Sequence, residues 1–478
     1  MTALWANGGM ETLALLLAFL KQLVPIVALC VLVSGLDDVL IDTLYGLRGL
    51  RARHLAARTA PPRITAQDMA RKPADWIVIF VPALREANVI GPMLRHALRT
   101  LEYPRYLILV GTYPDDPETQ AAVCAVARED SRVRCIVGDQ PSKGSCKAAN
   151  LNVLYRAMLS LEAQGHPPFK AVVLHDAEDV VHPLELAVFN WHIPKKALVQ
   201  LPVLPLPHQG ARWFQRWIAH TYLEEFAVAH SRDMVVRNWL GASLPSAGVG
   251  CGLSRPAIAH AARQNGGLPF GTTSKTEDYE LGISLGLHGF PALMAHVPAS
   301  PLDASWVATR GHFPSKLIAS VRQRSRWLLG IGLGGWRRFG WPRNLADCYM
   351  LLRDRKALPC AWLNLLALAL TAVLLLLWLL SCLPTWPPVP PLIEPGSLTA
   401  HLLVCNLALL VWRSLHRIIV TTRHFGLREG LGSVPRSIVA IPIHALAASL
   451  ALFDDLREWI TRKPAPWRKT AHTFSTAK

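Results

Sequence analysis

The sequence predicts a mostly parallel α/β domain inserted between membrane-spanning helices. The chain has 478 residues, of which 51% are hydrophobic and only 17% are charged, and the apolar residues come in blocks. Apolar stretches with the length of a membrane span lie near both ends of the chain. Between them, short runs of β-forming residues alternate with helical segments, which is typical of a parallel sheet covered by helices.

Three stretches have the length and composition of transmembrane helices. Residues 361–383 contain no charged side chain and would rise about 34 Å as a helix, enough to cross a bilayer. Residues 12–33 form a second candidate despite Lys21, whose insertion costs roughly 2.5–3.5 kcal/mol that the surrounding Leu and Val offset. Residues 399–420 form the third. No Lys or Arg precedes Lys21, which argues against a cleaved signal peptide.

The basic residues predict how these helices cross the membrane. Arg and Lys are frequent after the first and third spans, whereas the loop 384–398 between the second and third contains none. Because positively charged loops stay in the cytoplasm, we expect this loop outside, and both 48–360 and the tail after residue 460 inside. Residues 437–453 are apolar but short and broken by Pro442, so we expect a re-entrant or interfacial segment there.

These features divide the chain into five expected segments. They are an N-terminal transmembrane helix over 1–47, a cytoplasmic domain over 48–330, an interfacial connector over 331–360, two transmembrane helices over 361–430, and a re-entrant segment with a cytoplasmic tail over 431–478.

The composition argues against two other kinds of site. The net charge of +17 comes from basic residues beside the apolar stretches, which suits cytoplasmic membrane flanks and anionic nucleotide substrates better than a nucleic-acid-binding module. The nine cysteines are scattered singly without a C-x-x-C pair, so neither a zinc site nor a disulfide framework is indicated.

The central part of the chain carries the pattern of the α/β domain. Short apolar runs predict strands at 76–82, 106–111, 133–137 and 170–174. Helical patterns fill the gaps, for example at 86–101 and 144–164. In such sheets the ligand binds beyond the carboxyl ends of the strands, so the residues after each run are site candidates. The first strand is not followed by a G-x-G-x-x-G or P-loop sequence, which argues against a dinucleotide or P-loop site.

Acidic residues at these strand ends suggest a nucleotide-sugar site, in which a divalent cation bridges carboxylates and a diphosphate. In HDAEDVV the candidate metal ligands are Asp176, Glu178 and Asp179. Strand alternation lets Asp176 and Glu178 project the same way. An acidic run is also typical of a solvated loop or a helix cap, but its position directly after VVL favours a functional role.

Two later stretches have both a structural and a functional interpretation. In KTEDYELGISL, Thr276 is a plausible N-cap, and Asp278 is either a first-turn helix charge or a general base. In RQRSRWLLGIGLGGW, helical spacing places Gln323, Arg326 and Trp327 on one face. That face suits a phosphate, a hydroxyl and a sugar ring, although a basic helix anchored at the bilayer by Trp is the alternative.

Taken in order, FVPALREAN, YPDDPET, KAANLN, DAED, TED and Q-x-x-R-W resemble the motifs of the membrane-embedded family 2 glycosyltransferases, which include cellulose and hyaluronan synthases. The resemblance covers roughly residues 76–330 and implies a GT-A-type fold. SGLDDVLID (34–42), RDRKAL (353–358) and WRKTAH (467–472) resemble one bacterial branch, inner-membrane proteins linked to a secreted polysaccharide that a phage uses for entry. Because the chain stops soon after WRKTAH, we expect it to lack the C-terminal extension of longer members, which is associated with cyclic-di-GMP control.

The resemblance implies a role for each motif. The substrate-binding residues would be Pro82, Glu86, Asp115, Asp116, Lys147, Asn150 and Asn152. Asp176 with Glu178 or Asp179 would hold Mg²⁺ or Mn²⁺; the family pattern is Asp-x-Asp, so the second ligand stays open. The catalytic group would be Glu277, Asp278, Gln323, Arg326 and Trp327. Within it, Asp278 would be the base, Arg326 would offset diphosphate charge, and Trp327 would be a platform for the acceptor sugar.

The expected function is that of an inverting, processive glycosyltransferase. It would move a sugar from a UDP-linked nucleotide sugar to a polysaccharide or lipid-linked acceptor at the bacterial inner membrane. The expected partners are membrane lipids and an outer-membrane or periplasmic secretion partner, without nucleic acid. Transfer of a single sugar to a lipid is one alternative. The other is a catalytically idle membrane scaffold or receptor component for polysaccharide secretion or phage adsorption.

Overall fold

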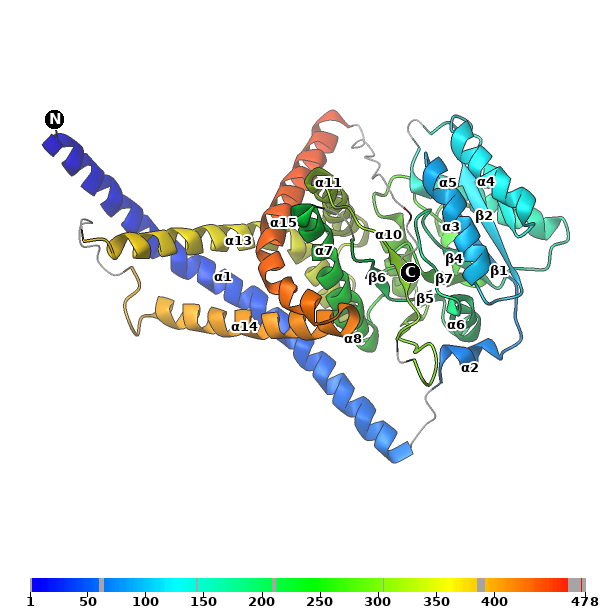
Figure 1. The fold of residues 1–478 in the computed structure, drawn as a ribbon, viewed down its shortest axis with the longest axis horizontal. Helices are drawn as coiled ribbons and strands as arrows, with labels where there is room; N and C mark the ends of the chain where they lie inside the picture. Colours follow the sequence, from blue (N-terminus) through cyan, green and yellow to red (C-terminus); the bar gives the residue numbers. More distant parts are fainter. Residues whose placement is uncertain are drawn as a thin grey trace.

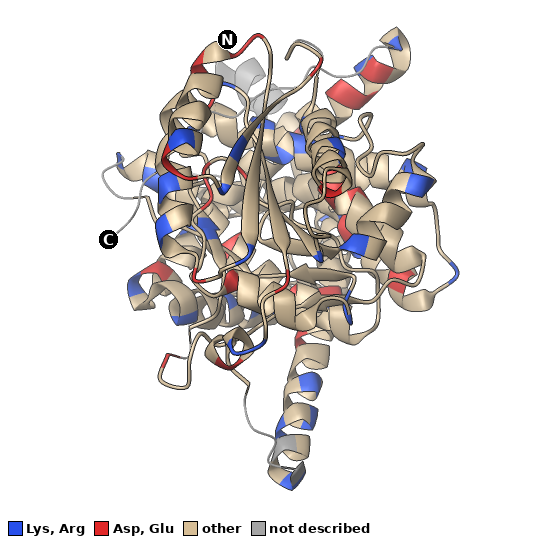
Figure 2. Cartoon of the chain, turned by 90° about the vertical axis from the view of Figure 1, so that its right-hand side faces the viewer, with Lys and Arg blue, Asp and Glu red and all other residues tan. Residues whose placement is uncertain are grey.

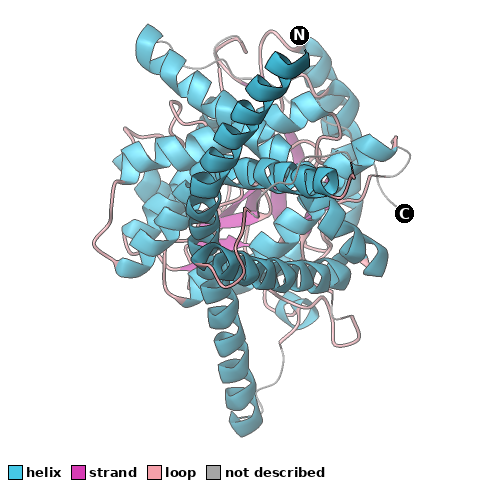
Figure 3. Cartoon of the chain, turned by 90° about the vertical axis from the view of Figure 1, so that its left-hand side faces the viewer, coloured by secondary structure: helices cyan, strands magenta, loops and turns pink. Residues whose placement is uncertain are grey.

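The computed structural model describes residues 2–59, 64–142, 145–208, 212–303, 305–384, 392–462 and 474. Figure 1 shows an α/β domain on one side and a group of long helices on the other, with shorter helices between them. Seen from the helical side, the strands lie behind the long helices (Figure 3).

The α/β domain is built on a seven-stranded sheet with the order β3-β2-β1-β4-β7-β5-β8. Its strands are β1 (Ile77–Pro82), β2 (Tyr106–Thr112), β3 (Val133–Val137), β4 (Ala171–Leu174), β5 (Leu198–Gln200), β7 (Cys251–Ser254) and β8 (Ala292–Met294). Only β7 runs antiparallel to its neighbours. The four predicted strands and the mostly parallel sheet are therefore confirmed. A separate parallel pair joins β6 (Val203–Pro205) to β9 (Thr309–Gly311).

Helices cover both faces of the sheet, which explains why its strands are apolar on both sides. On one face Ile77, Ile79 and Val81 pack against α2 (Ala66–Ala70), α3 (Ala87–Thr100), α4 (Pro117–Glu129) and α6 (Glu185–His192). On the other, Val78 and Phe80 pack against α5 (Lys147–Ala163), α9 (Arg255–Gln264) and α10 (Glu277–Leu287). Because alternate side chains point to opposite faces, a strand covered on both sides reads as a continuous apolar run.

Shorter helices connect this domain to the long ones. They are α7 (Trp213–Val228), α8 (Met234–Trp239), α11 (Leu317–Trp327), α12 (Gly335–Phe339) and two π-helical segments, η1 (Ala229–Asp233) and η2 (Leu328–Gly334). The segment η1 continues α7 into α8, and η2 continues α11 into α12.

Four of the described helices are long and apolar enough to cross a membrane. They are α1 (Thr2–Thr59), α13 (Leu345–Ser381), α14 (Leu398–Phe425) and α15 (Leu427–Thr461). In α1, the predicted span contacts α13 through Leu20 and Val27. Its Lys21 pairs with Glu394, with 2.9 Å between Nζ and Oε1. The far end of α1 projects from the body and carries exposed Arg residues (Figure 2).

The helix α15 corrects one expectation. Pro442 was expected to interrupt a short segment, but α15 is a continuous helix of 35 residues that includes both Pro435 and Pro442. Packing overrides the local cost of proline, since Ala440, Ile443 and Ala447 are buried along the helix. Figure 1 shows α15 (orange to red) running across the ends of α13 and α14 rather than alongside them. The number of spans stays a prediction. Part of the loop 384–398 and, apart from Phe474, the tail beyond residue 462 lie outside the described residues.

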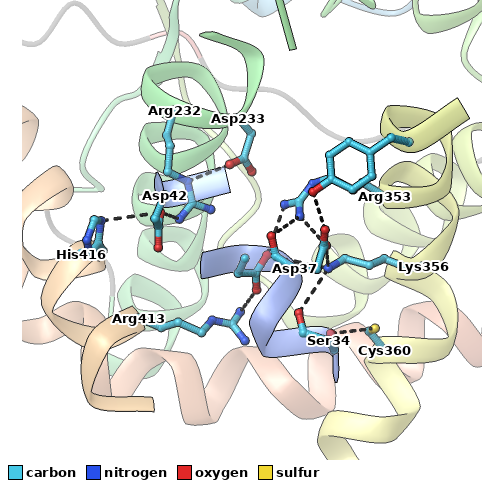
Figure 4. Close-up of polar contacts among 12 residues, drawn as sticks. Ser34, Asp37, Asp42, Arg232, Asp233, Arg353, Lys356, Cys360, Arg413 and His416 are labelled. Carbon is cyan, nitrogen blue, oxygen red and sulfur yellow. Dashed lines mark hydrogen bonds and ion pairs between the residues drawn. The ribbon is translucent and has the colours of Figure 1, made fainter. Parts of the chain in front are cut away.

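Three carboxylates of α1, Asp37, Asp38 and Asp42, join the long helices to one another; we call them the acidic clamp. Figure 4 shows Asp37 and Asp42 with their partners. Asp37 pairs with Arg353 and Lys356 of α13. Asp38 pairs with Arg413 of α14 at 3.0 Å.

The third clamp residue reaches the α/β side of the molecule. Asp42 pairs with Arg232 of η1 at 2.5 Å and accepts a hydrogen bond from Trp412 Nε1 at 2.8 Å. One stretch of α1 therefore holds α13, α14 and the helix that leads back to the α/β domain.

Asp42→Asn is expected to lower the stability of the protein. The Asp42 side chain is fully buried. The amide would remove the charged acceptor of Trp412 and one of the two carboxylates that pair with Arg232, the other being Asp233 at 2.8 Å, a loss of about 1–3 kcal/mol. Thermal melting in detergent measures the effect. The control is Lys21→Gln, which removes a pair whose side chains are 57% and 62% exposed and should change the melting temperature little. Equal shifts for the two variants would contradict a special role for the clamp.

Candidate active site

A cavity of about 410 Å³ lies at the carboxyl ends of β1 and β4. Its walls come from the residues that follow these strands, from the first turns of α5 and α10, from α11, and from the segment after β9. This is the position that a covered parallel sheet predicts for a ligand.

The cavity collects most of the predicted site residues from five separate elements. Those that line it are Pro82, Glu86, Lys147, Asn150, Asp176, Glu178, Asp179, Glu277, Asp278, Gln323, Arg326 and Trp327. The predicted shared face of Gln323, Arg326 and Trp327 therefore does point into one space.

Three predicted substrate-binding residues do not line the cavity. Asp115 accepts hydrogen bonds from the backbone N–H and the hydroxyl of Ser142, at 2.7 and 2.6 Å. Asp116 is the N-cap of α4. Asn152 exchanges two hydrogen bonds with the backbone of Phe270. For Asp116 the sequence held a signal, because Asp-Pro-Glu is a typical helix start.

Lys147 lies among the acidic residues of the cavity. Its Nζ is 2.5 Å from Asp176 Oδ1 and donates a hydrogen bond to the carbonyl of Gly248 at 3.5 Å. Burial alone would lower the pKa of Lys147, but the carboxylates of Asp176, Glu277 and Asp278 outweigh it and raise that pKa. The lysine is therefore a fixed cation that binds together two acidic motifs distant in sequence.

The second acidic motif begins α10. Thr276 is the N-cap, as predicted, although its side chain makes no capping hydrogen bond. Asp278 Oδ1 accepts a hydrogen bond from the Tyr279 N–H at 2.7 Å. Desolvation raises the pKa of Asp278, and burial together with the Asp278 charge raises the pKa of Glu277 to about 7. Gly248, at φ +75°, leaves room for Asp278, since a Cβ there would collide with its carboxylate.

Among the acids that follow β4, Asp179 is held by hydrogen bonds within the turn. Asp179 Oδ2 accepts hydrogen bonds from His175 Nδ1 and from the Asp176 N–H, both at 3.0 Å. His175 Nε2 lies 2.7 Å from Glu185 Oε1. Burial would lower the pKa of His175, but Glu185 and Asp179 raise it to about 10, so the imidazole is protonated and donates to both. Asp179 thus closes the turn that presents Asp176 and Glu178 to the cavity.

The carboxylates of the cavity are compatible with a divalent cation that is held partly by the protein and partly by the bound ligand. Within the described ranges, no group of three or more His, Cys, Asp and Glu side chains is arranged to hold a metal ion by itself. Carboxylate oxygens such as those of Asp176 and Glu178 are ligands that Mg²⁺ and Mn²⁺ prefer. Mg²⁺ commonly takes one or two protein carboxylates and completes its shell with phosphate oxygens and water.

The opposite face of α11 contains a residue to which the sequence assigned no role. Arg324 is buried and pairs with both oxygens of Glu225 at 2.9 Å. It also donates to Thr221 Oγ1 at 2.8 Å and lies 3.7 Å from the centre of the Tyr222 ring. This ion pair fixes α11 against α7 and so orients the face that lines the cavity.

The sequence analysis also missed one wall of the cavity. His208, Phe226, Lys275, His312, Phe313 and Lys316 line it as well. Phe313 packs against Tyr222 and Phe226 at ring distances of 4.8 and 4.6 Å, beside Trp327. The available signal was the Gly-His-Phe-Pro sequence at the end of β9, which resembles an ordinary turn because β9 has only three residues.

The profile of glycosyl transferase family group 2 matches residues 171–381. That range begins at β4 and ends with α13, so it includes the two acidic motifs and α11. Among solved structures, a mannosyltransferase from Pyrobaculum calidifontis in complex with GDP-Man and Mn²⁺ superposes with a TM-score of 0.51 at 16% identity, covering 90% of this chain and 99% of that one. At this identity the likeness concerns the fold, which is GT-A-like as expected.

The chain is also similar to two named bacterial proteins. It is 34% identical over 472 residues to bacteriophage adsorption protein B of Escherichia coli K12 and, to the same extent, to bacteriophage N4 adsorption protein B of E. coli O157:H7. The similarity covers 95% of this chain, which spans 62% of the length of these relatives. Of the stretches that predicted this branch, 34–42 contains all three residues of the acidic clamp and 353–358 contains two of their partners, Arg353 and Lys356. The third stretch, 467–472, lies outside the described residues. The chain is thus similar to bacteriophage adsorption protein B over most of its own length, and its residues 171–381 match the profile of glycosyl transferase family group 2.

Proposed function

We propose that the chain is an inverting glycosyltransferase that takes a sugar from a nucleotide-sugar donor and passes it to a polysaccharide or lipid-linked acceptor. UDP is the expected nucleotide of the donor. The observation that carries this proposal is the convergence of Lys147, Asp176, Asp278 and Arg326 on one cavity. Two cations suit a departing diphosphate, and a desolvated carboxylate suits the removal of a hydroxyl proton. The family 2 profile supports the same chemistry.

The residues suggest a single displacement. The acceptor hydroxyl would give its proton to Asp278 as its oxygen forms a bond to the anomeric carbon. The bond from that carbon to the diphosphate oxygen would break, and the electron pair would leave on the nucleotide diphosphate. Attack opposite the leaving group inverts the anomeric centre. Arg326 would stabilise the charge that develops on the diphosphate, in a site where desolvation strengthens the interaction.

Asp176 and Glu178 would hold Mg²⁺ or Mn²⁺ against the diphosphate, where the ion supplies Lewis-acid stabilisation of the leaving group when bound. The hydrogen bonds of Asp179 to His175 and to the Asp176 N–H favour Glu178 as the second ligand. Trp327 and the adjacent Phe313 offer an aromatic platform for the acceptor sugar. A platform that accepts each elongated product in turn would make the enzyme processive.

We further propose that the enzyme lies in the bacterial inner membrane with its cavity facing the cytoplasm, where nucleotide sugars are made. The spans would be parts of α1, α13 and α14, and α15 would lie in the interface. The transverse direction of α15 in Figure 1 supports this assignment, as does the excess of Arg and Lys after the first and third spans.

A panel of UDP-sugars tests the activity, with release of UDP as the readout. We expect turnover with one donor, its loss in excess chelator, and a reduction by orders of magnitude in Asp176→Asn, because an anionic ligand beside the diphosphate is removed. Asp139→Asn is the matched control, since Asp139 is an acid that lies outside the cavity and has a side chain that is 78% exposed. Full activity in chelator would exclude the metal-assisted mechanism. Absence of turnover with every donor would favour the scaffold or receptor alternative.

Asp278→Asn separates acceptor chemistry from donor binding. The amide has the same shape but cannot take the hydroxyl proton, so transfer should fall by about 10²–10⁴-fold while affinity for the nucleotide sugar is retained. Arg326→Ala should weaken both donor affinity and turnover, and Trp327→Ala should mainly shorten the product. If a folded Asp278→Asn protein elongated the product at a near wild-type rate, Asp278 would not be the base, and its role would be that of a charge in the first turn of a helix.

Single cysteines test the topology in a background without the native ones. Glu394→Cys should react with a membrane-impermeant maleimide from the periplasm, whereas Arg462→Cys should react only after the membrane is opened. The reason is the distribution of basic residues, which favours retention of the tail in the cytoplasm. Labelling of Arg462→Cys from the periplasm would show that α15 crosses the membrane as a fourth span.

A further inference from the structure

The glycines that follow Trp327 are not equivalent in the structure. Gly330 lies directly against Thr276, the N-cap of α10. A Cβ at Gly330 would stand 2.6 Å from Thr276 Cγ2 and 2.9 Å from Thr276 Cβ, distances that real side chains do not tolerate. Gly332, in the same η2 segment, has nothing within 4 Å of the equivalent position. Only one of these two glycines is therefore required by a close approach.

The π-helical geometry of η2 determines which glycines face α10. Its hydrogen bonds join residues five apart, which brings Gly330 and Gly335 toward one side of the helix. A Cβ at Gly335 would lie 3.3 Å from Tyr279 Cε1. Both glycines thus face the first turn of α10, at positions on either side of Glu277 and Asp278.

Packing, rather than capping, holds Thr276 in place. Its side chain makes no capping bond, and its hydroxyl is buried without a hydrogen-bond partner in the described part of the chain. The residue is 5% exposed. Its backbone N–H donates to Ser274 Oγ at 3.1 Å, so it is the side chain whose position depends on the packing surface, which includes Gly330.

We propose that Gly330 is a positioning residue that sets the distance between the first turn of α10, which carries Asp278, and α11, which carries Arg326 and Trp327. The inference rests on the proposed transfer reaction, in which the base must reach a hydroxyl held beside the aromatic platform. A shift of about 1 Å in such a group can cost on the order of 10²-fold in rate. Gly330 contacts neither the donor nor the acceptor and acts through Thr276.

Gly330→Ala and Gly332→Ala form the matched pair for the test. We expect about a 10²-fold loss of kcat in Gly330→Ala, with a much smaller loss of UDP affinity measured by calorimetry, because Lys147 and Asp176 do not depend on this contact and only Arg326 moves with α11. Gly332→Ala should behave like the wild type. Thr276→Gly in the Gly330→Ala background should recover most of the turnover of Thr276→Gly alone, since it removes the atoms that the new methyl group meets and glycine is tolerated at an N-cap.

The outcomes are distinguishable from failure of the proposed function. If the wild type neither binds UDP nor releases it from any sugar donor, the function itself is wrong. If the wild type is active and the two alanine variants turn over equally, the positioning role is wrong. Should Gly330→Ala lose its melting transition, the double variant decides: recovery of fold and turnover upholds the contact, and no recovery relative to Thr276→Gly overturns it.

Discussion

The acidic clamp is the constraint on which the arrangement of the whole chain depends. Charges near the membrane are costly unless they are paired, and Asp37, Asp38 and Asp42 find cations on α13, α14 and η1. The pair with Arg232 matters most for the site, because η1 directly continues α7, whose Phe226 lines the cavity. The long helices and the cavity wall are thus joined through buried charge pairs, and the cavity cannot move relative to α1 without separating them.

Within the cavity a second electrostatic constraint operates. Lys147 gathers Asp176 and the acids of α10 around one buried cation. Six carboxylates (Glu86, Asp176, Glu178, Asp179, Glu277 and Asp278) line the cavity together with four Lys and Arg side chains (Lys147, Lys275, Lys316 and Arg326). The carboxylates outnumber the cations, so the site is suited to a ligand that brings its own counter-ion. Arg324 contributes from outside the cavity, because its pair with Glu225 turns α11 so that Arg326 and Trp327 face inward.

Local patterns predicted the elements that depend on local chemistry. Continuous apolar runs gave the four strands, and helical spacing gave the shared face of Gln323, Arg326 and Trp327. Helical spacing could not show that Arg324 is a buried structural residue whereas Arg326 lines the cavity, since the partner of Arg324, Glu225, lies 99 residues away in the sequence. Pro442 was expected to break a helix that tertiary packing keeps continuous. The His312 and Phe313 wall was missed because β9 and β6 pair with each other across more than a hundred residues, and neither is long enough to be recognised alone.

The buried pairs at the start of α15 bear on how that helix meets the membrane. Arg436 pairs with Glu224 of α7 at 3.1 Å, and both side chains are almost completely buried. Glu429 accepts from His220 of the same helix, with 2.9 Å between Nδ1 and Oε2. A helix that crossed the bilayer in this region would have to carry these charges away from α7, at a cost of several kcal/mol for each unpaired ion. The same pairs hold α15 against the helices that frame the cavity. These shared charges, like the direction of α15, support the proposal that this helix lies in the interface.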